Sequence, residues 1–292
     1  VLPTFFGGSA DLSHSNMTFI KGEGLQNNEN RVARNVQFGV REFGMATILN
    51  GLMLHGGVRV FGGTFFVFSD YLKAALRLSA LQNLPVTYVF THDSIAVGED
   101  GPTHEPIEHL ASLRTIPNTY VFRPADATEA QAAWYLSQKV NNKPTSLVLT
   151  RQNLPVLENT SFEKVSKGAY VVYETSSDFD TILIATGSEV ALAVDVAREL
   201  EKEGSKVRVV SMPSVELFEE QSKEYKEELL PRSVRRRVSL EMGNTALWYK
   251  YVGLDGLAIG IDNFGASAPA NKVIEEYGFT VAKVVERIKN EL

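Results

Sequence analysis

Short runs of apolar residues alternate along the chain with longer segments of helical hydrophobic spacing. The runs predict strands at residues 58–60, 86–91, 119–122, 146–150, 181–185, 207–212, 238–240 and 257–261. Runs such as VTYVFT and TILIAT are almost entirely apolar or β-branched, which is typical of strands that are covered on both faces. The sequence therefore favours buried sheets over exposed ones.

The segments between these runs predict helices, which lie at residues 40–55, 71–81, 127–140, 189–203 and 280–291. Strands that alternate with helices imply right-handed crossovers and a mostly parallel sheet. Residues 154–168, with the sequence LPVLENTSFEKVSKG, break this pattern and indicate a linker. We therefore predict an α/β protein of two domains, residues 1–160 and 161–292, each a mostly parallel sheet flanked by helices.

Composition narrows the possible partners and the compartment. The 292 residues are 44% hydrophobic and 22% charged, which is ordinary for a soluble globular protein. A net charge of -6 argues against a nucleic-acid or anionic-membrane surface, and the lack of cysteine excludes disulfides and thiolate chemistry. No apolar run approaches the roughly 18 residues of a membrane span. We expect a cytoplasmic protein and, since Val1 stands where an initiator Met is usual and no signal peptide follows, a fragment of a longer chain.

Candidate chemistry is concentrated in the first domain, which holds all five histidines. The densest segment is 91–106, THDSIAVGEDGPTHEP, which follows an apolar strand and so lies at the carboxyl edge of the sheet, where α/β proteins bind ligands. Its His92, Asp100 and His104 suit hydrogen bonding to an anionic, polyhydroxylated substrate. The alternatives are a surface loop with turn-capping polar residues and a metal site, which the absence of paired ligands at helical spacing disfavours.

Eight motifs in order along the chain resemble those of transketolases. They are GGSADL-x-x-SN at 7–16, FGVREF at 38–43, TFFVFSDY at 64–71, THDSI with GEDGPTH at 91–104, RPAD at 123–126, RQNLP at 151–155, ATGSEV at 185–190 and FGASAP at 264–269. The chain resembles the C-terminal portion of that family, the pyrimidine-binding domain followed by the C-terminal domain. This resemblance implies thiamine diphosphate as cofactor.

The resemblance implies a catalytic role for Glu42, as the glutamate that hydrogen-bonds a ring nitrogen of thiamine so that the aminopyrimidine acts as a base. By itself, Glu42 at the head of an apolar helix is more typical of a carboxylate favoured by the helix dipole. Phe65, Phe68 and Tyr71 match the aromatic residues that hold the pyrimidine, although such spacing alone is more typical of an ordinary core. Asp11 matches an aspartate near the cofactor and the subunit interface.

The substrate site follows from the same resemblance. Ser15, His92 and Arg151 match residues that bind the sugar phosphate, and the guanidinium of Arg151 offers a planar donor fork. Asp100 matches the aspartate that recognises the C2 hydroxyl. His104 matches a histidine near the reacting carbonyl and the C1 hydroxyl, where it donates hydrogen bonds or relays protons. We therefore expect His92 and His104, with Glu42, to be the catalytic residues.

Part of the expected site has no match in this sequence. The GDG motif that holds Mg²⁺ (or Ca²⁺) and the cofactor's diphosphate is absent, so we expect no metal ligand here. The chain should then need its own N-terminal diphosphate-binding domain or a separate subunit, and should be inactive alone. The resemblance also implies a homodimer.

The expected activity is reversible transfer of a two-carbon ketol group from a ketose phosphate to an aldose phosphate, a reaction of the pentose phosphate pathway. Dihydroxyacetone synthase, another thiamine-dependent enzyme, and a non-catalytic transketolase-like subunit stay open as alternatives. The second domain offers little for catalysis. Ser188 stands where it caps a helix, and we favour a plain turn there over an anion site; Arg232, Arg235, Arg236 and Arg237 indicate a salt-bridged surface.

Overall fold

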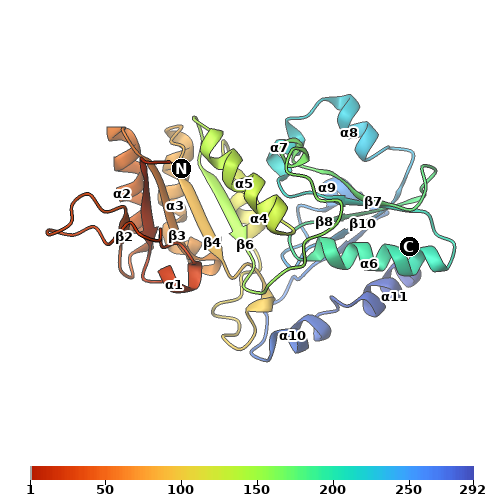
Figure 1. Cartoon of the computed structure of the whole chain (residues 1–292). Coiled ribbons are helices and arrows are strands. Elements are labelled where there is room, and N and C mark those ends of the chain that lie inside the picture. Colours follow the sequence, from red (N-terminus) through yellow and green to blue (C-terminus); the bar gives the residue numbers. More distant parts are fainter. Residues whose placement is uncertain (1) are drawn as a thin grey trace.

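The computed structural model describes residues 2–292 and contains two sheets side by side, each with helices on its faces (Figure 1). The first sheet has the order β2-β1-β3-β4-β6-β5 and is entirely parallel. Its strands are β1 (Phe5–Ser9), β2 (Asn35–Gln37), β3 (Arg59–Phe65), β4 (Thr87–Thr91), β5 (Tyr120–Phe122) and β6 (Thr145–Leu149).

The second sheet has the order β11-β10-β8-β9-β7 and is parallel except for β7, which pairs antiparallel to β9. Its strands are β7 (Tyr170–Glu174), β8 (Thr181–Ala185), β9 (Val207–Ser211), β10 (Arg236–Leu240) and β11 (Leu257–Ile259). The prediction of an α/β fold with two mostly parallel sheets is therefore confirmed. The boundary near residue 160 stays a prediction.

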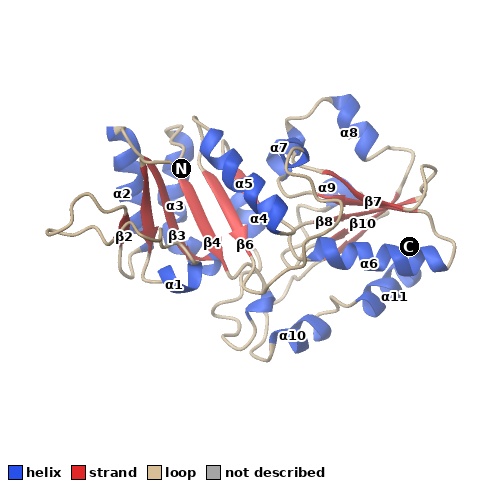
Figure 2. Cartoon of the chain, viewed as in Figure 1, coloured by secondary structure: helices blue, strands red, loops and turns tan. Residues whose placement is uncertain are grey.

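The longer helices lie where the hydrophobic spacing predicts them (Figure 2). They are α2 (Glu42–His55), α3 (Ser69–Leu81), α5 (Ala127–Lys139), α6 (Glu189–Lys202) and α11 (Val281–Glu291). The spacing does not predict the short helices α1 (Ser13–Asn16), α4 (His109–Arg114), α7 (Val215–Glu219), α8 (Lys223–Leu229), α9 (Tyr249–Val252) and α10 (Ala270–Glu276), or the 3₁₀ turns η1 (Phe66–Phe68), η2 (Ile95–Val97) and η3 (Lys164–Lys167). Each of these spans two turns or fewer, too short for a period to show.

Packing joins the two domains into one interior. α2 and α3 cover one face of the first sheet with side chains such as Leu49 and Leu72. On the other side, a single apolar cluster runs from Phe122 and Leu147 of the first sheet to Leu183 of the second. The domains therefore share a hydrophobic core. Among residues 2–292, no helix has both the length and the apolar character that crossing a membrane requires.

Candidate functional site

The candidate site residues lie after strands that all end at the carboxyl edge of the first sheet. Because these strands are parallel, the segments that follow them start at the same edge. Asp11 and Ser15 follow β1, Glu42 follows β2, Phe65 ends β3 with Phe68 and Tyr71 after it, His92, Asp100 and His104 follow β4, and Arg151 follows β6. The fold thus gathers residues that are far apart in the sequence.

A row of rings forms the centre of this edge. The ring of Phe65 stacks on that of His92 with 3.7 Å between centroids, and Phe68 lies 6.0 Å from Phe65 and 5.9 Å from Tyr71. The ring of His104 meets Phe68 edge-on at 5.4 Å. Phe65 is buried, whereas Tyr71 is 65% exposed. The row therefore runs from the interior to the surface and leaves aromatic faces open to a ligand.

His92 is the most constrained residue of the site. Its backbone has φ of +63°, a left-handed conformation that is uncommon for any residue other than glycine, and its Nδ1 lies 2.8 Å from the Thr91 hydroxyl. Burial lowers the pKa of His92, and the positive charge of Arg151 acts in the same direction, while Asp100 and Asp93 oppose it. These effects favour a neutral ring and place Arg151 and Asp100 within electrostatic reach of it.

Glu42 is the first residue of α2 and is only 9% exposed. Within residues 2–292 its carboxylate makes no hydrogen bond or ion pair. Helix α2 packs on α3, and because both begin at the carboxyl edge, Glu42 and Tyr71 lie at the same end of this helix pair. A nearly buried carboxylate with no partner from the chain suits a polar ligand that is bound there.

The remaining predicted residues are more exposed. Asp11, Ser15, Asp100 and Arg151 are accessible at the surface of the edge, and the Nδ1 of His104 lies 2.8 Å from the Thr103 hydroxyl. The structure brings His92, His104 and the three aromatic rings into contact. It places Asp11, Ser15 and Glu42 at the same edge without a direct contact to that cluster among the described residues.

Of the other three histidines, His14 is exposed at the surface, and His55 and His109 have structural surroundings. His55 is exposed at the end of α2, and His109 is buried, with its Nε2 3.2 Å from Asp70. Asp70, Glu108 and His109 stand close enough to hold a cation. However, the ammonium of Lys73 already lies 2.9 Å from Asp70, and the two carboxylates face different ring nitrogens of His109. We therefore assign this group no metal.

The loop after β4 is held against the second domain, next to α10 (Figure 1). Gly98 and Gly101 both have positive φ. A Cβ on Gly98 would lie 3.0 Å from the amide nitrogen of Ala270, and a Cβ on Gly101 would lie 2.9 Å from the Cβ of Ser267. The Ser267 hydroxyl donates a hydrogen bond of 2.5 Å to the carbonyl of Glu99. The sequence motifs GEDGPTH and FGASAP, from different domains, are therefore parts of one contact.

Glu105 adds a buried carboxyl to the same contact. It is 2% exposed, neither of its oxygens has a well-formed hydrogen bond among residues 2–292, and a Cβ on Gly265 would lie 1.8 Å from its Oε2. Burial raises the pKa of Glu105 to about 7, although the nearby backbone of Gly98 and Ala266 acts in the opposite direction. Sequence reasoning missed this residue, since nothing in THEP indicates burial.

Arg123 of the RPAD motif also joins the domains, a role that the sequence does not reveal. Its Nε donates to Asp93 at 2.9 Å, its Nη1 donates to Glu189 and to the Thr186 hydroxyl, and all three charged side chains are buried. Nearby, Arg114 forms two hydrogen bonds of 2.8 Å with Glu241. Asp93, the residue after His92, is therefore linked to the second domain through Arg123, which pairs with both Asp93 and Glu189.

Ser188 stands at the N-cap position of α6, as the sequence predicts, but its side chain binds another partner. The Ser188 side chain makes no capping hydrogen bond, because its hydroxyl instead donates to the Glu189 carboxylate at 2.5 Å. The guanidinium of Arg123 packs against Gly187. This helix start is thus occupied by the chain's own ion pair, which agrees with a plain turn and leaves no anion site.

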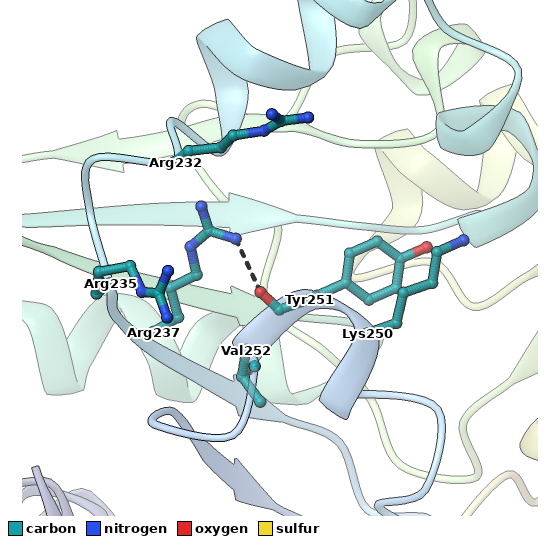
Figure 3. A pocket seen from close by; sticks show the side chains of 7 residues that line it. Arg232, Arg235, Arg237, Lys250, Tyr251 and Val252 are labelled. Carbon is teal, nitrogen blue, oxygen red and sulfur yellow. Dashed lines mark hydrogen bonds between the residues drawn. The ribbon is translucent and has the colours of Figure 1, made fainter.

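A hollow in the second domain is lined by basic side chains (Figure 3). Arg237 donates to the carbonyls of Tyr251, Leu230 and Pro231. The other cations are paired with carboxylates, Arg232 with Glu227, Arg235 with Asp255, and Lys250 with Glu219. The prediction of a salt-bridged surface is therefore confirmed for Arg232 and Arg235. It is wrong for Arg237, which binds backbone carbonyls, and for Arg236, which forms no ion pair among residues 2–292.

The fold and the site define an α/β domain pair. Its first sheet offers aromatic rings, two histidines and charged groups at the carboxyl edge, and its second domain supports the loop that carries them.

The comparisons with known proteins give the family. The sequence profile of the transketolase pyrimidine-binding domain matches residues 1–156, and that of the transketolase-like C-terminal domain matches residues 168–280. The chain belongs to the transketolase family and corresponds to a C-terminal portion of its members. It is 70% identical to a probable transketolase of Streptococcus pneumoniae and 58% identical to the transketolase of Bacillus subtilis, each over 99% of this chain and 44% of the relative.

A solved structure of a Pichia stipitis transketolase mutant in complex with xylulose 5-phosphate has a TM-score of 0.95 and 44% identity. The match covers 99% of this chain and 43% of that one. The chain thus spans less than half the length of the relatives that it matches.

Proposed function

We propose that this chain is the pyrimidine-binding and C-terminal part of a transketolase. The complete enzyme would transfer a two-carbon ketol group reversibly from a ketose phosphate to an aldose phosphate, in the pentose phosphate pathway. The observation that carries the proposal is the contact of Phe65, Phe68, His92 and His104 at the carboxyl edge of the first sheet. Aromatic faces beside hydrogen-bonding rings suit a heteroaromatic cofactor next to a sugar.

The residues present fit one half of thiamine diphosphate. Phe65, Phe68 and Tyr71 would stack on its pyrimidine ring, and Glu42 would share a proton with a nitrogen of that ring. The exposed ring of Tyr71 and the unpartnered, nearly buried carboxylate of Glu42 support this assignment. When bound, the cofactor supplies an acidic thiazolium carbon that serves as the nucleophile. Asp11 would lie near the cofactor and the subunit interface.

The substrate residues act by position and charge. Ser15, His92 and Arg151 would bind the sugar phosphate, with Arg151 as the permanent cation and His92 as a neutral hydrogen-bond donor. Asp100 would accept a hydrogen bond from the C2 hydroxyl. His104 would donate to the reacting carbonyl and the C1 hydroxyl, where it could also move a proton. The sugar phosphate bound to the Pichia stipitis relative supports this substrate class.

The chain requires a partner for the rest of the site. Its own N-terminal diphosphate-binding domain or a separate subunit would hold Mg²⁺ or Ca²⁺, and the assembly would be a homodimer in the cytoplasm. Val40, Phe43, Ile48 and Leu54, in and just before α2, are all more than half exposed. Such an apolar surface supports association on this side of the first domain. We expect residues 1–160 to provide this surface and the chain alone to be inactive.

The test restores the missing half. The chain is combined with the diphosphate-binding region of a relative, thiamine diphosphate and Mg²⁺, and turnover of xylulose 5-phosphate with ribose 5-phosphate is measured. Glu42→Gln should lower kcat by about 100-fold or more, because it removes the shared proton. Glu286→Gln on the exposed face of α11 is the control and should keep full activity. No turnover, with Glu42→Gln equal to the parent, would favour a non-catalytic subunit.

A further inference from the structure

Thr91, the last residue of β4, stands between two polar side chains of the site. Its hydroxyl oxygen lies 2.7 Å from Nδ2 of Asn16 and 2.8 Å from Nδ1 of His92. The carbonyl oxygen of the Asn16 side chain in turn accepts a hydrogen bond of 2.6 Å from the hydroxyl of Ser9. All four side chains are buried. A continuous chain of hydrogen bonds therefore runs from β1 through the end of α1 to His92.

The direction of these bonds favours one position for the proton of His92. The Asn16 amide donates to the Thr91 oxygen, which leaves the proton of the Thr91 hydroxyl free for a bond of its own. The neighbouring acceptor is Nδ1 of His92. A neutral imidazole that accepts at Nδ1 carries its proton on Nε2.

The surroundings of His92 favour this neutral form. Its ring is stacked on Phe65, and the positive charge of Arg151 disfavours an imidazolium. Asp100, Asp93 and His104 are the other charged or titratable groups that act on it, and Asp93 is already neutralised by an ion pair within the protein. Nε2 makes no hydrogen bond to any residue in 2–292 and is not sealed from solvent. It is therefore the one polar atom of the ring left for a ligand.

We propose that Asn16 and Thr91 are positioning residues that hold His92 as the Nε2-protonated tautomer. This gives the site a hydrogen-bond donor for an oxygen atom of a phosphorylated, polyhydroxylated ligand. The inference deepens the proposed function, and only the identity of the ligand rests on that function. Neither Asn16 nor Thr91 touches the ligand in this scheme; both act through His92.

The first test measures the tautomer in the unaltered chain. The protein is labelled with ¹⁵N-histidine, and a long-range ¹H–¹⁵N spectrum is recorded at a pH where the ring is neutral, with His92→Gln used to assign the signals. We expect a pyridine-type shift for Nδ1 and a pyrrole-type shift for Nε2. The reverse pattern would overturn the proposal, since it requires Nδ1 to donate to the Thr91 hydroxyl instead of accepting from it.

The second test removes the hydroxyl that fixes the tautomer. Thr91→Val should shift the balance between the two tautomers by about fivefold, the equivalent of one ordinary hydrogen bond. Thr91→Ser should restore the parent spectrum. The control is Thr64→Val: Thr64 is also buried, lies on the adjacent strand β3, and its hydroxyl has no hydrogen-bond partner among residues 2–292. Equal spectra for Thr91→Val and Thr64→Val would also overturn the proposal.

These outcomes are independent of the proposed activity. The spectra need neither cofactor nor substrate, so the tautomer of His92 can be established even if the assembled protein shows no turnover. Conversely, an active enzyme with the Nδ1-protonated tautomer would retain the function and remove only the role of Asn16 and Thr91. If Thr91→Val fails to fold, the spectrum of the unaltered chain still decides between the two tautomers.

Discussion

Arg123 in the first domain and Glu189 in the second form an ion pair in which neither side chain is exposed. The same guanidinium binds Asp93, the residue that follows His92. Burying a charged side chain away from water is costly. It is tolerated here because each of these charged side chains has a partner of opposite charge. The pair therefore links the position of the loop after β4 to the presence of the second domain.

Removing this guanidinium should destabilise the protein strongly. Arg123→Ala leaves Asp93 and Glu189 as buried carboxylates without a cation, which costs about 3–5 kcal/mol. The expected result is a large fall in the urea midpoint. Arg198→Ala serves as the control, because Arg198 pairs with Asp195 on the exposed face of α6 and should contribute little. Equal midpoints for the two variants would contradict a structural role of the buried pair.

Two glycine variants distinguish the effect of the contact between the domains on stability from the effect of backbone strain. Gly101→Ala and Gly57→Ala both place a Cβ at positive φ, +72° and +88°, which costs about 1–2 kcal/mol. The new Cβ at Gly101 would also lie 2.9 Å from Ser267, whereas no atom lies within 4 Å of the new Cβ at Gly57. We expect the greater loss of stability, and a disturbed loop, from Gly101→Ala. Thermal unfolding and protease sensitivity of the loop measure this.

Glu105 should make stability depend on pH. Its folded pKa of about 7 lies above its ordinary value of 4.5, because burial disfavours the charged carboxylate. The contribution of Glu105 to the free energy of unfolding is thus fully present below about pH 4.5 and is lost as the pH rises through about 7. Glu105→Gln, which cannot ionise, should be more stable than the parent at pH 8 and lose this part of the pH dependence. Urea unfolding at pH 5 and pH 8 provides the comparison.

The pKa of His92 should respond with opposite signs to two changes. Arg151→Gln removes a positive charge that lowers this pKa, so the pKa should rise. Asp100→Asn removes a negative charge that raises it, so the pKa should fall further. NMR titration of the His92 ring signal gives both values. Arg77→Gln on α3 is the control, since Arg77 is not among the groups that act on His92; a shift in the same direction for both variants would show that the charges are wrongly placed.

The sequence predicted the fold where hydrophobic runs were long and uninterrupted. β4 and β8 are nearly all apolar or β-branched, and both lie within a residue of their predicted positions. β1 was missed because its FFGGS contains two glycines, whose hydrogen is what lets the strand approach the carbonyls of Phe61 and Val36. β3 was cut short for a similar reason, because Gly62 and Gly63 interrupt its apolar run.

The sequence suggests candidate members of the site but not the residues that support them. Resemblance to a family identified residues such as His92 and Phe65, and the parallel sheet explains why they meet at one edge. Spacing alone could not show that Phe65 stacks on His92, or that Glu105 is buried against Gly265. Both depend on contacts between segments far apart in the chain. The roles of Arg123 and Thr91 stayed hidden because an arginine or threonine at a strand end is unremarkable in sequence.

The close contact of Gly98 and Gly101 with residues 267–270 has a consequence for recombination between relatives. A hybrid that joined the first domain of one family member to the second domain of another would bring together two surfaces that had not evolved to fit each other. A single added methyl group on either surface would displace the loop of Asp100 and His104. The second domain thereby restricts which sequences the loop after β4 can have, and we expect the two to vary in concert.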